Sequence, residues 1–593
     1  MKAIIKNIKN ILWLCRPYWK YGRLYLILSI TVATLLAPIK DVIYVFFPER
    51  VVDLLVGGQS FLYVTLYALI ICSISLMTYL IPCAFYSYFE RKNTYINLKI
   101  NSDIYKKAAQ IDYKYIDNPD YYNRYTWAIN EYVRQTNAAR DFINNTLQYF
   151  MAIAVLLSII ATIGPWILLI EGVQLVLHAI INIRENKIDI RQKEELNPVQ
   201  RRLSYYHRLF YLQDYSADIK STKLKDYIFK KYESTGKTNI EIVNRYAKKT
   251  LLLGMLHESI FAITEFGIIV YLIYNITIGN IPEVGLYITM ILAFYRVDSK
   301  LQGFIDLLRR ANELSLNAEE IHKFFEIKSE IEDGSAEQKL IPTNDIFSVE
   351  LKDVSFAYEN SGFALSNINI VIKPGEKIAV GGENGAGKST FIKLLLRLYD
   401  VSSGEILING HSIKNYDVHA LRQKIGVAFQ NPNIYAMTFA ENISLYNDVS
   451  DDKINRIAKQ FDFNSVFTKN DAGYDAELTR EFDQQGIILS GGEIQKVALA
   501  RIMYGNFGLL LLDEPSSALD PIAEYKMSEL ILSAANKTTT IMVAHRLSTT
   551  RNADRIVLID NGVIKEAGTH DELMLLHGKY YEMFTKQAEN YIK

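Results

Sequence analysis

Six long apolar stretches in the first half of the chain constrain its fold more than any other feature. They lie near residues 24–46, 62–87, 142–163, 165–183, 251–277 and 283–305 of a 593-residue chain. A membrane-crossing helix needs about 20 mostly apolar residues, and inside a bilayer only helices or closed barrels satisfy their backbone hydrogen bonds. The sequence therefore predicts a multidomain membrane protein that begins with an all-α transmembrane domain of six helices.

The loops between these stretches differ in length and in basic residues. Residues 88–140 and 184–250 are rich in lysine and arginine, whereas the alternate loops are short and nearly free of both. Because basic loops stay in the cytoplasm, we predict that both long loops and both termini are cytoplasmic. The long loops are expected to continue the spans as helices, with short cross-pieces near 112–122 and 211–219 that can touch a soluble domain.

The character of the chain changes near residue 330. Residues 330–345 are polar and contain glycine, serine and proline, as linkers do, and a pattern of short strands and helices follows them. We expect a transmembrane domain over 1–329, a linker over 330–345 and a soluble α/β domain over 346–593. Basic and acidic residues number 65 each, so the net charge gives no argument for a nucleic-acid partner.

The strongest local motif is GENGAGKS at 382–389, which follows an apolar strand and which we call the phosphate loop. The glycines Gly382, Gly385 and Gly387 let backbone amides face phosphate oxygens at a helix N-terminus. Lys388 can reach the β- and γ-phosphates, and Ser389 can place its hydroxyl on magnesium. A chance glycine-rich turn would not reproduce the complete motif, so we predict an α/β P-loop ATPase domain that binds ATP and Mg²⁺.

A second motif, LLLLDEP at 509–515, reads as a buried strand that ends in two acids. Asp513 is placed to hold magnesium, and Glu514 is placed to polarise the attacking water. The alternative is a strand that merely ends in solvated acids. That alternative does not explain why the strand and the phosphate loop occur in one domain.

The segment LSGGE at 489–493 narrows the range of P-loop ATPase families to which the chain can belong. With it, the chain resembles the ATP-binding-cassette (ABC) superfamily over essentially its whole length. Tyr358 matches the residue that stacks on adenine, Gln430 the glutamine facing the membrane domain, and His545 the histidine that contacts the γ-phosphate. SALD at 517–520 matches the loop that links two nucleotide sites. Seven motifs in the expected order carry this resemblance.

The resemblance implies a role for each matched residue. The resemblance implies that Glu514, His545 and Gln430 are catalytic and that Ser389, Gln430 and Asp513 bind magnesium. It implies that the nucleotide is bound by Tyr358, Gly382, Glu383, Asn384, Gly385, Ala386, Gly387, Lys388, Ser389, Thr390, Ser490, Gly491 and Gly492. It also implies that Ser490, Gly491 and Gly492 of one cassette cap the γ-phosphate held by Lys388 of another, so that ATP binding closes a dimer and hydrolysis reopens it.

Six spans followed by one cassette resemble the exporter branch, type IV fold, in which two half-transporters combine. A homodimer is the simpler expectation, and a homologous half-transporter is the alternative partner. The loop 115–124 resembles one found in bacterial exporters of peptides, drugs and lipids, which places the chain in a plasma membrane, the bacterial inner membrane. Glu493 departs from the commoner glutamine, and Glu481 only partly matches a coupling glutamate of the family.

Charged residues inside the spans bear on the cargo, because such residues usually face a cavity or a partner. Glu171 and His178 share a helical face, and so do Glu258 and Glu265. One hypothesis is a cavity that favours cationic or peptide-like cargo. The alternative is an internal network in which Glu171 or Glu265 pairs with His178 or Arg296. A lipid flippase, which would need basic residues near the inner cavity mouth, and a nucleotide-gated regulator or channel remain as further functions, and the direction of transport stays open.

Overall fold

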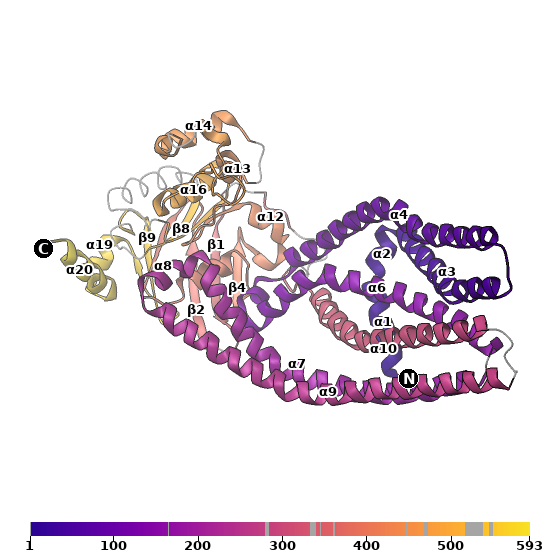
Figure 1. The fold of residues 1–593 in the computed structure, drawn as a ribbon. Coiled ribbons are helices and arrows are strands. Elements are labelled where there is room, and N and C mark those ends of the chain that lie inside the picture. Colours follow the sequence, from indigo (N-terminus) through magenta and orange to yellow (C-terminus); the bar gives the residue numbers. More distant parts are fainter. Residues whose placement is uncertain are drawn as a thin grey trace. The chain divides into compact units, whose positions relative to one another are not determined.

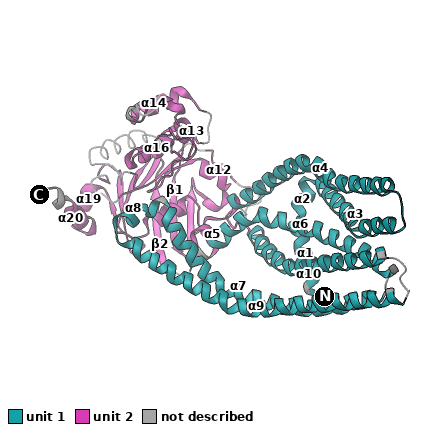
Figure 2. Ribbon diagram, viewed as in Figure 1, with its two compact units in different colours: residues 1–109, 123–327 teal, residues 110–122, 328–593 magenta. Residues whose placement is uncertain are grey.

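The structure of the protein is a computed structural model that describes residues 2–163, 165–278, 284–331, 340–343, 346–359, 362–445, 449–467, 472–515, 538–544 and 550–592. The chain forms two compact units (Figure 2). Residues 1–109 and 123–327 form one, here the membrane unit, and residues 110–122 and 328–593 form the other, here the cassette unit. Most of the expected linker, 332–339 and 344–345, lies outside the described residues.

Six long helices contain the six predicted spans. They are α3 (Arg23–Val56), α4 (Phe61–Gln110), α6 (Pro119–Ile163), α7 (Pro165–Tyr211), α9 (Leu224–Thr277) and α10 (Val284–Glu326), labelled in Figure 1. Among the described residues, all of these except α10 include a segment long and apolar enough to cross a membrane. The charged residues Arg296, Asp298 and Lys300 make the first half of α10 less apolar than the other spans. The chain is thus a multi-pass membrane protein.

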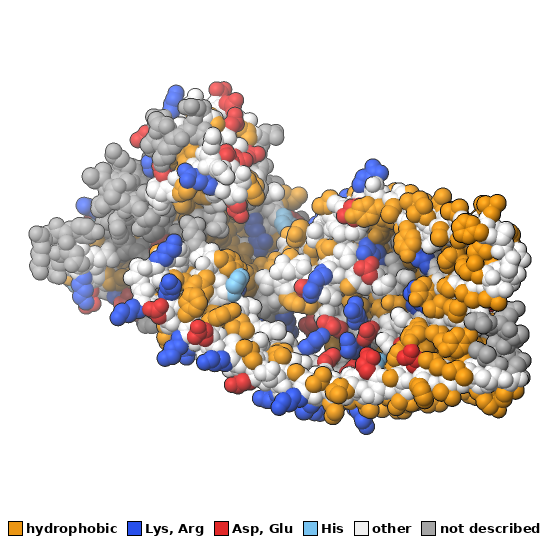
Figure 3. Space-filling model, in the orientation of Figure 1, with side chains coloured by type: hydrophobic (Ala, Val, Ile, Leu, Met, Phe, Trp, Pro, Cys, Tyr) orange, Lys and Arg blue, Asp and Glu red, His pale blue; other side chains and the backbone are white. Residues whose placement is uncertain are grey.

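The helices of the membrane unit pack through a shared apolar core and leave other apolar faces outside. Val45 of α3, Leu156 of α6, Leu272 of α9 and Phe294 of α10 are buried in one cluster. Hydrophobic side chains cover the visible ends of the helices where α3 passes into α4 (Figure 3). Exposed apolar surface of this extent is typical of helices that contact lipid.

Two further helices precede the spans, α1 (Lys2–Leu14) and α2 (Arg16–Tyr21). One face of α1 packs against α10: Ile11 and Leu14 are buried, and Asn10 donates a hydrogen bond of 3.0 Å to Glu319. The opposite face leaves Ile4, Ile5, Ile8 and Leu12 exposed. Exposed isoleucines with lysines beside them are what a helix on a membrane surface requires.

The helical extensions of the spans and their cross-pieces form as expected. The cross-pieces are α5 (Tyr113–Asp117) and α8 (Gln213–Ser221). Within the cassette unit, α5 is fixed at both ends. Asp112 accepts a hydrogen bond of 2.8 Å from the Glu330 amide, and Asp117 accepts one of 2.6 Å from the Tyr399 hydroxyl. Lys393 pairs with Asp117 at 3.3 Å.

The cassette unit contains two sheets. One has the order β2-β1-β4-β5 and the other the order β10-β9-β3-β8-β7-β6. The strands are β1 (Val349–Ala357), β2 (Phe363–Ile372), β3 (Lys377–Gly381), β4 (Ser403–Ile408), β5 (His411–Ser412), β6 (Ile425–Ala428), β7 (Leu509–Asp513), β8 (Thr539–Val543), β9 (Arg555–Asp560) and β10 (Val563–Gly568). The pairs from β9 through β3, β8 and β7 to β6 are parallel, so their carboxyl ends share one edge. That edge is where α/β sheets bind ligands.

Besides α5, the described α-helices of this unit are α11 (Lys388–Leu395), α12 (Val418–Gln423), α13 (Phe439–Ser444), α14 (Asp451–Gln460), α15 (Asn464–Phe467), α16 (Gly491–Tyr504), α19 (His570–Leu575) and α20 (Lys579–Ile592). They divide between two apolar clusters. Phe391 and Ile392 of α11 pack with both sheets in the first cluster. Val497 and Leu499 of α16 pack with α13 and α14 in the second. The fold is therefore an α/β P-loop cassette with a helical subdomain.

The bond between α5 and Tyr399 yields a testable prediction. Removing either side of it, by Asp117→Asn or Tyr399→Phe, is expected to lower the unfolding midpoint of the purified chain by about 2–4 °C, since a hydrogen bond to a charged group is lost. Asp117→Asn also weakens the 3.3 Å ion pair with Lys393, so the double variant is expected to fall no further than Asp117→Asn alone. Tyr121→Phe, which removes an exposed hydroxyl nearby, is the control. Fully additive losses in a thermal scan would contradict this assignment.

Candidate functional site

The phosphate loop connects β3 to α11, and its glycines occupy positions that other residues cannot. Gly382 has φ 150° and Gly387 has φ 104°. A Cβ at Gly382 would lie 2.2 Å from the Ile559 carbonyl oxygen, and one at Gly387 would lie 2.6 Å from the Ala364 carbonyl oxygen. Both contacts are too short, so only glycine allows this backbone. The loop thus forms a close-fitting concave turn at the start of a helix.

Lys388 begins α11 and turns its side chain back into the loop. Its Nζ donates hydrogen bonds of 2.9 Å to the carbonyl oxygens of Gly382 and Glu383. Burial lowers the pKa of Lys388, and the negative charges of Glu514 and Asp513 oppose that shift. The ammonium therefore sits inside a backbone cradle with both carboxylates close enough to act on it. This is the arrangement that anion binding by a phosphate loop requires.

The two acids follow β7, whose residues are all buried. Glu514 has φ 49°, and its amide donates to the Val543 carbonyl oxygen at 3.0 Å. This positive φ directs the carboxylate out of the strand line, where Glu514 Oε2 accepts a hydrogen bond of 2.7 Å from Gln430 Nε2. Gln430 follows β6, the parallel neighbour of β7. The structure thus brings Lys388, Gln430, Asp513 and Glu514 to one sheet edge.

The remaining predicted residues of the loop differ in exposure. Ala386 and Thr390 are buried, whereas Glu383, Asn384, Gly385 and Ser389 are exposed. The Thr390 hydroxyl lies 3.1 Å from the Tyr358 hydroxyl. The Tyr358 ring meets Phe356 and Tyr399 edge-on, with centroid distances of 4.9 and 5.4 Å. Tyr358 is thus held beside α11, a position from which it can contact a base.

The LSGGE segment forms the N-terminus of α16. Ser490 caps this helix: its hydroxyl accepts from the Glu493 amide at 3.4 Å, while Glu493 Oε2 accepts from the Ser490 amide at 2.7 Å. This reciprocal pair is a capping box. Glutamate at 493, where the family commonly has glutamine, thus completes the cap of α16. Gly491 and Gly492 form the first turn.

The residues around Ser490 and the phosphate loop belong to different parts of the cassette. The helix that begins after Ser490 packs in the second apolar cluster and α11 packs in the first. His545 and residues 517–520 lie outside the described residues. Four segments are expected to supply catalytic or magnesium-binding residues. The structure describes the three that contain Ser389, Gln430 and the Asp513–Glu514 pair, and the fourth contains His545.

The charged residues of the fourth and fifth spans lie next to polar residues of α9 and α10. Glu171 is buried in α7, and His178 lies 4.0 Å from Asp298 and stacks on His257 at a centroid distance of 3.7 Å. Gln174 donates to Asp298 at 2.6 Å. Glu265 is hydrogen-bonded to Tyr295. His178 therefore lies beside Asp298 of α10 and His257 of α9, and Glu265 beside Tyr295 of α10; the network hypothesis named none of these three residues.

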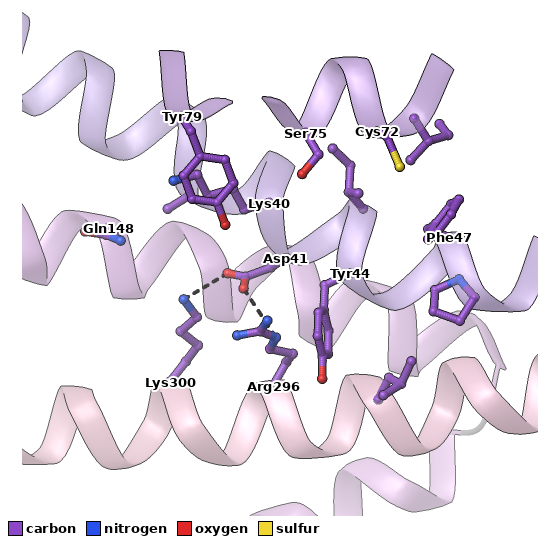
Figure 4. A pocket seen from close by; sticks show the side chains of 15 residues that line it. Lys40, Asp41, Tyr44, Phe47, Cys72, Ser75, Tyr79, Gln148, Arg296 and Lys300 are labelled. Atoms are coloured by element: carbon purple, nitrogen blue, oxygen red, sulfur yellow. Dashed lines mark ion pairs between the residues drawn. The ribbon is translucent and has the colours of Figure 1, made fainter. Parts of the chain in front are cut away.

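A pocket of about 480 Å³ opens between α3, α4, α6 and α10 (Figure 4). Glu171, His178, Glu258 and Glu265 do not line it. Its charged lining residues are Lys40, Asp41, Arg296 and Lys300. Sequence reasoning missed Lys40, Asp41 and Lys300, although the signal was available: they are charged residues inside two of the predicted spans.

A phosphate-binding cassette joined to six long helices, five of which include a described segment apolar enough to cross a membrane, defines an ATP-dependent membrane transporter. Comparison with known proteins agrees. The ABC transporter family model matches residues 365–517. The chain is 32% identical over 510 residues to the subtilin transport ATP-binding protein SpaT of Bacillus subtilis, across 84% of this chain and 80% of that protein. ABC transporter B family member 3 of Dictyostelium discoideum is 40% identical over 243 residues, 40% of this chain and 17% of that protein.

A solved bacterial Atm1-family ABC exporter with ATP bound has the same fold. It matches with a TM-score of 0.79 over 95% of this chain and 98% of that chain, at 22% identity. The chain belongs to the ABC transporter family. It is a nucleotide-binding, ATP-hydrolysing exporter, and its half-transporter architecture of one membrane domain and one cassette indicates that it dimerises.

The capping box leads to a prediction about Glu493. The Ser490 hydroxyl donates to Glu493 Oε2 at 2.9 Å, so a carboxylate lies beside the group expected to contact a γ-phosphate. Glu493→Gln retains a capping residue but removes that charge. We expect the KM for ATP in steady-state hydrolysis to fall roughly threefold to tenfold. Asp452→Asn, which removes an exposed charge from α14, is the matched control. An unchanged KM for Glu493→Gln would refute the proximity argument.

Proposed function

We propose that two copies of this chain form a transporter that exports an amphipathic, peptide-like molecule, driven by ATP at two composite sites. The observation that carries the proposal is the convergence of Lys388, Gln430 and Glu514 at one sheet edge. Those three groups are what phosphoryl transfer needs: a cation for phosphate charge, a ligand near the metal and a carboxylate to orient water.

The donors expected for Mg²⁺ fit that ion. The Ser389 hydroxyl, the Gln430 amide oxygen and the Asp513 carboxylate are all oxygen ligands, which magnesium prefers. Bound Mg²⁺ supplies charge neutralisation at the β- and γ-phosphates. Lys388 binds the phosphates, Tyr358 orients the base, and Glu514 accepts a proton from the attacking water. The Gln430–Glu514 bond of 2.7 Å keeps that carboxylate aimed at the site.

We propose that each site is completed by a second copy of the chain. Ser490 caps α16, a helix of 14 residues, and Gly491 and Gly492 form its first turn, whose amides suit an anion. The body of α16 packs in the second cluster, and Ser490 and Gly491 at its N-terminus are exposed, which supports a contact with the nucleotide on the partner's Lys388. His545 is proposed to contact the same γ-phosphate. Binding of ATP would then favour the closed pair, and hydrolysis the open one.

The cellular location follows from the basic loops. With lysine and arginine concentrated in 88–140 and 184–250, we propose that both termini and both cassettes are cytoplasmic. The similarity to SpaT of Bacillus subtilis supports a bacterial source and a place in the bacterial cytoplasmic (inner) membrane.

The cargo is proposed from the pocket and from the relative. SpaT is named for transport of subtilin, and its similarity extends through the membrane domain. The acids that indicated a cationic cargo do not line the pocket of Figure 4, so the proposal does not require positive charge on the cargo. A lipid flippase is the second candidate, since the pocket contains the basic residues that such a protein needs.

The test is ATP hydrolysis by the purified protein in lipid nanodiscs. Glu514→Gln is expected to lower kcat at least about 100-fold while ATP binding is retained, because the group that orients water is lost. Glu405→Gln, an exposed acid on β4, is the control. Inside-out vesicles then report ATP-dependent uptake of the cargo that stimulates hydrolysis. Wild-type hydrolysis no faster than Glu514→Gln would reject the proposal and favour a nucleotide-gated regulator.

A further inference from the structure

The pocket in the membrane unit is unusual for its charge. Lys40, Arg296 and Lys300 are cationic, and Asp41 is the single carboxylate among the described residues that line it, which leaves a net charge of +2. Lys40 and Asp41 lie near the middle of α3, and the other two lie in the first half of α10 (Figure 4). Ionisable groups at such positions are costly in a membrane and mark functional sites.

Asp41 cannot neutralise all three cations. It is buried, and it pairs with Lys300 at 3.1 Å and with Arg296 Nε at 3.9 Å. Within the described part of the chain, no ion pair joins Lys40 to a carboxylate. One negative charge therefore serves two neighbours and leaves an excess of positive charge facing the pocket.

Two of the cations, Arg296 and Lys40, also contact aromatic rings. The Arg296 guanidinium lies 3.7 Å from the Tyr44 ring centroid, and Lys40 Nζ lies 4.1 Å from the Tyr79 ring centroid. Cation–π contacts stabilise a charge without neutralising it. The two cations are thus kept in position and remain able to pair with an incoming anion.

Apart from Ser75 and Gln148, most of the remaining lining is apolar or aromatic. Ile43, Phe47, Ile71 and Leu292 line the same pocket as the charged residues. A binding site with apolar walls and a few convergent polar groups suits an amphipathic ligand. The volume of about 480 Å³ is enough for a charged head with part of an apolar body, and not for a large molecule.

We propose that this pocket recognises the cargo through an anionic group, a carboxylate or a phosphate, that pairs with Lys40, Arg296 and Lys300. The apolar part of the cargo contacts Phe47 and its neighbours. The inference rests on the proposed export function and specifies its substrate class. An anion would offset the excess positive charge, so binding would stabilise the arrangement of α3 against α10.

The test is binding to the full-length protein in nanodiscs without ATP. The probe is an N-acetylated apolar peptide carrying a neutral fluorophore, made with a C-terminal carboxylate, amide or amine, and followed by fluorescence anisotropy against empty nanodiscs. We expect the carboxylate form to bind at least about tenfold more tightly than the amide. Lysophosphatidic acid against monoacylglycerol, as competitors, distinguishes a lipid phosphate from a peptide carboxylate as the source of the anion.

Two variants with opposite expected effects separate recognition from folding. Lys40→Gln should remove most of the preference for the carboxylate form and leave no buried charge unpaired. Asp41→Asn removes the competing carboxylate and should preserve or increase that preference. Arg310→Gln, an exposed arginine of α10 outside the pocket, should change nothing.

The possible outcomes decide between the proposals. Equal binding of carboxylate and amide forms, tighter binding of the amine form, or equal loss for Lys40→Gln and Arg310→Gln would overturn the anion site. Basal ATP hydrolysis, measured on the same nanodiscs, tests the export function separately. Loss of hydrolysis with intact anion binding would reject the function alone, whereas intact hydrolysis without anion preference would reject the pocket alone.

Discussion

The membrane unit depends on one constraint, that a polar group inside a bilayer must find its partner within the protein. Backbone groups meet it by forming helices, which is why the six spans are helical. Side chains meet it by pairing across helices. Asp41 pairs with Lys300, Asp298 accepts from Gln174, and Glu265 accepts from Tyr295. Each of these pairs ends on α10, so polar contacts from α3, α7 and α9 converge on the one long helix whose described residues include no segment apolar enough to be counted as a span.

The same constraint explains why the lining of the pocket matters. A structural ion pair needs one cation for each carboxylate, and the pocket has three cations for one. The positive excess is held by aromatic rings instead of by acids. Such an arrangement is expensive in a low-dielectric region unless water or a ligand shares the site. Recognition of an anion gives the arrangement a function.

In the cassette, the short helix α11 contributes residues both to the phosphate loop and to the contact with α5. The N-terminus of α11 carries Lys388 in the phosphate loop, and its last turn carries Lys393, which pairs with Asp117 of α5 at 3.3 Å. The phosphate loop and α5 are therefore connected through the eight residues of α11. Residues 110–122, which include α5, belong to the cassette unit.

The sequence by itself determined the elements whose cause is local. Six apolar stretches sufficed to predict six helices. GENGAGKS sufficed to predict a strand, a tight turn and a helix, because only glycine can occupy positions 382 and 387 without a steric clash. The cross-pieces α5 and α8 were predicted from the length of the basic loops. These features depend on hydropathy, backbone geometry and loop charge, each of which acts over a few neighbouring residues.

Only the tertiary structure decided which distant residues meet. Periodicity placed Glu171 and His178 on one face of a helix, but it could not say that Asp298 and His257 face them. It could not join Lys40 and Asp41 of the first span to Arg296 and Lys300 of the sixth, nor Gln430 to Glu514. Side-chain partners across helices and strands depend on how each element is rotated and packed against its neighbours. That rotation is set by the whole apolar core, and no local pattern in the sequence encodes it.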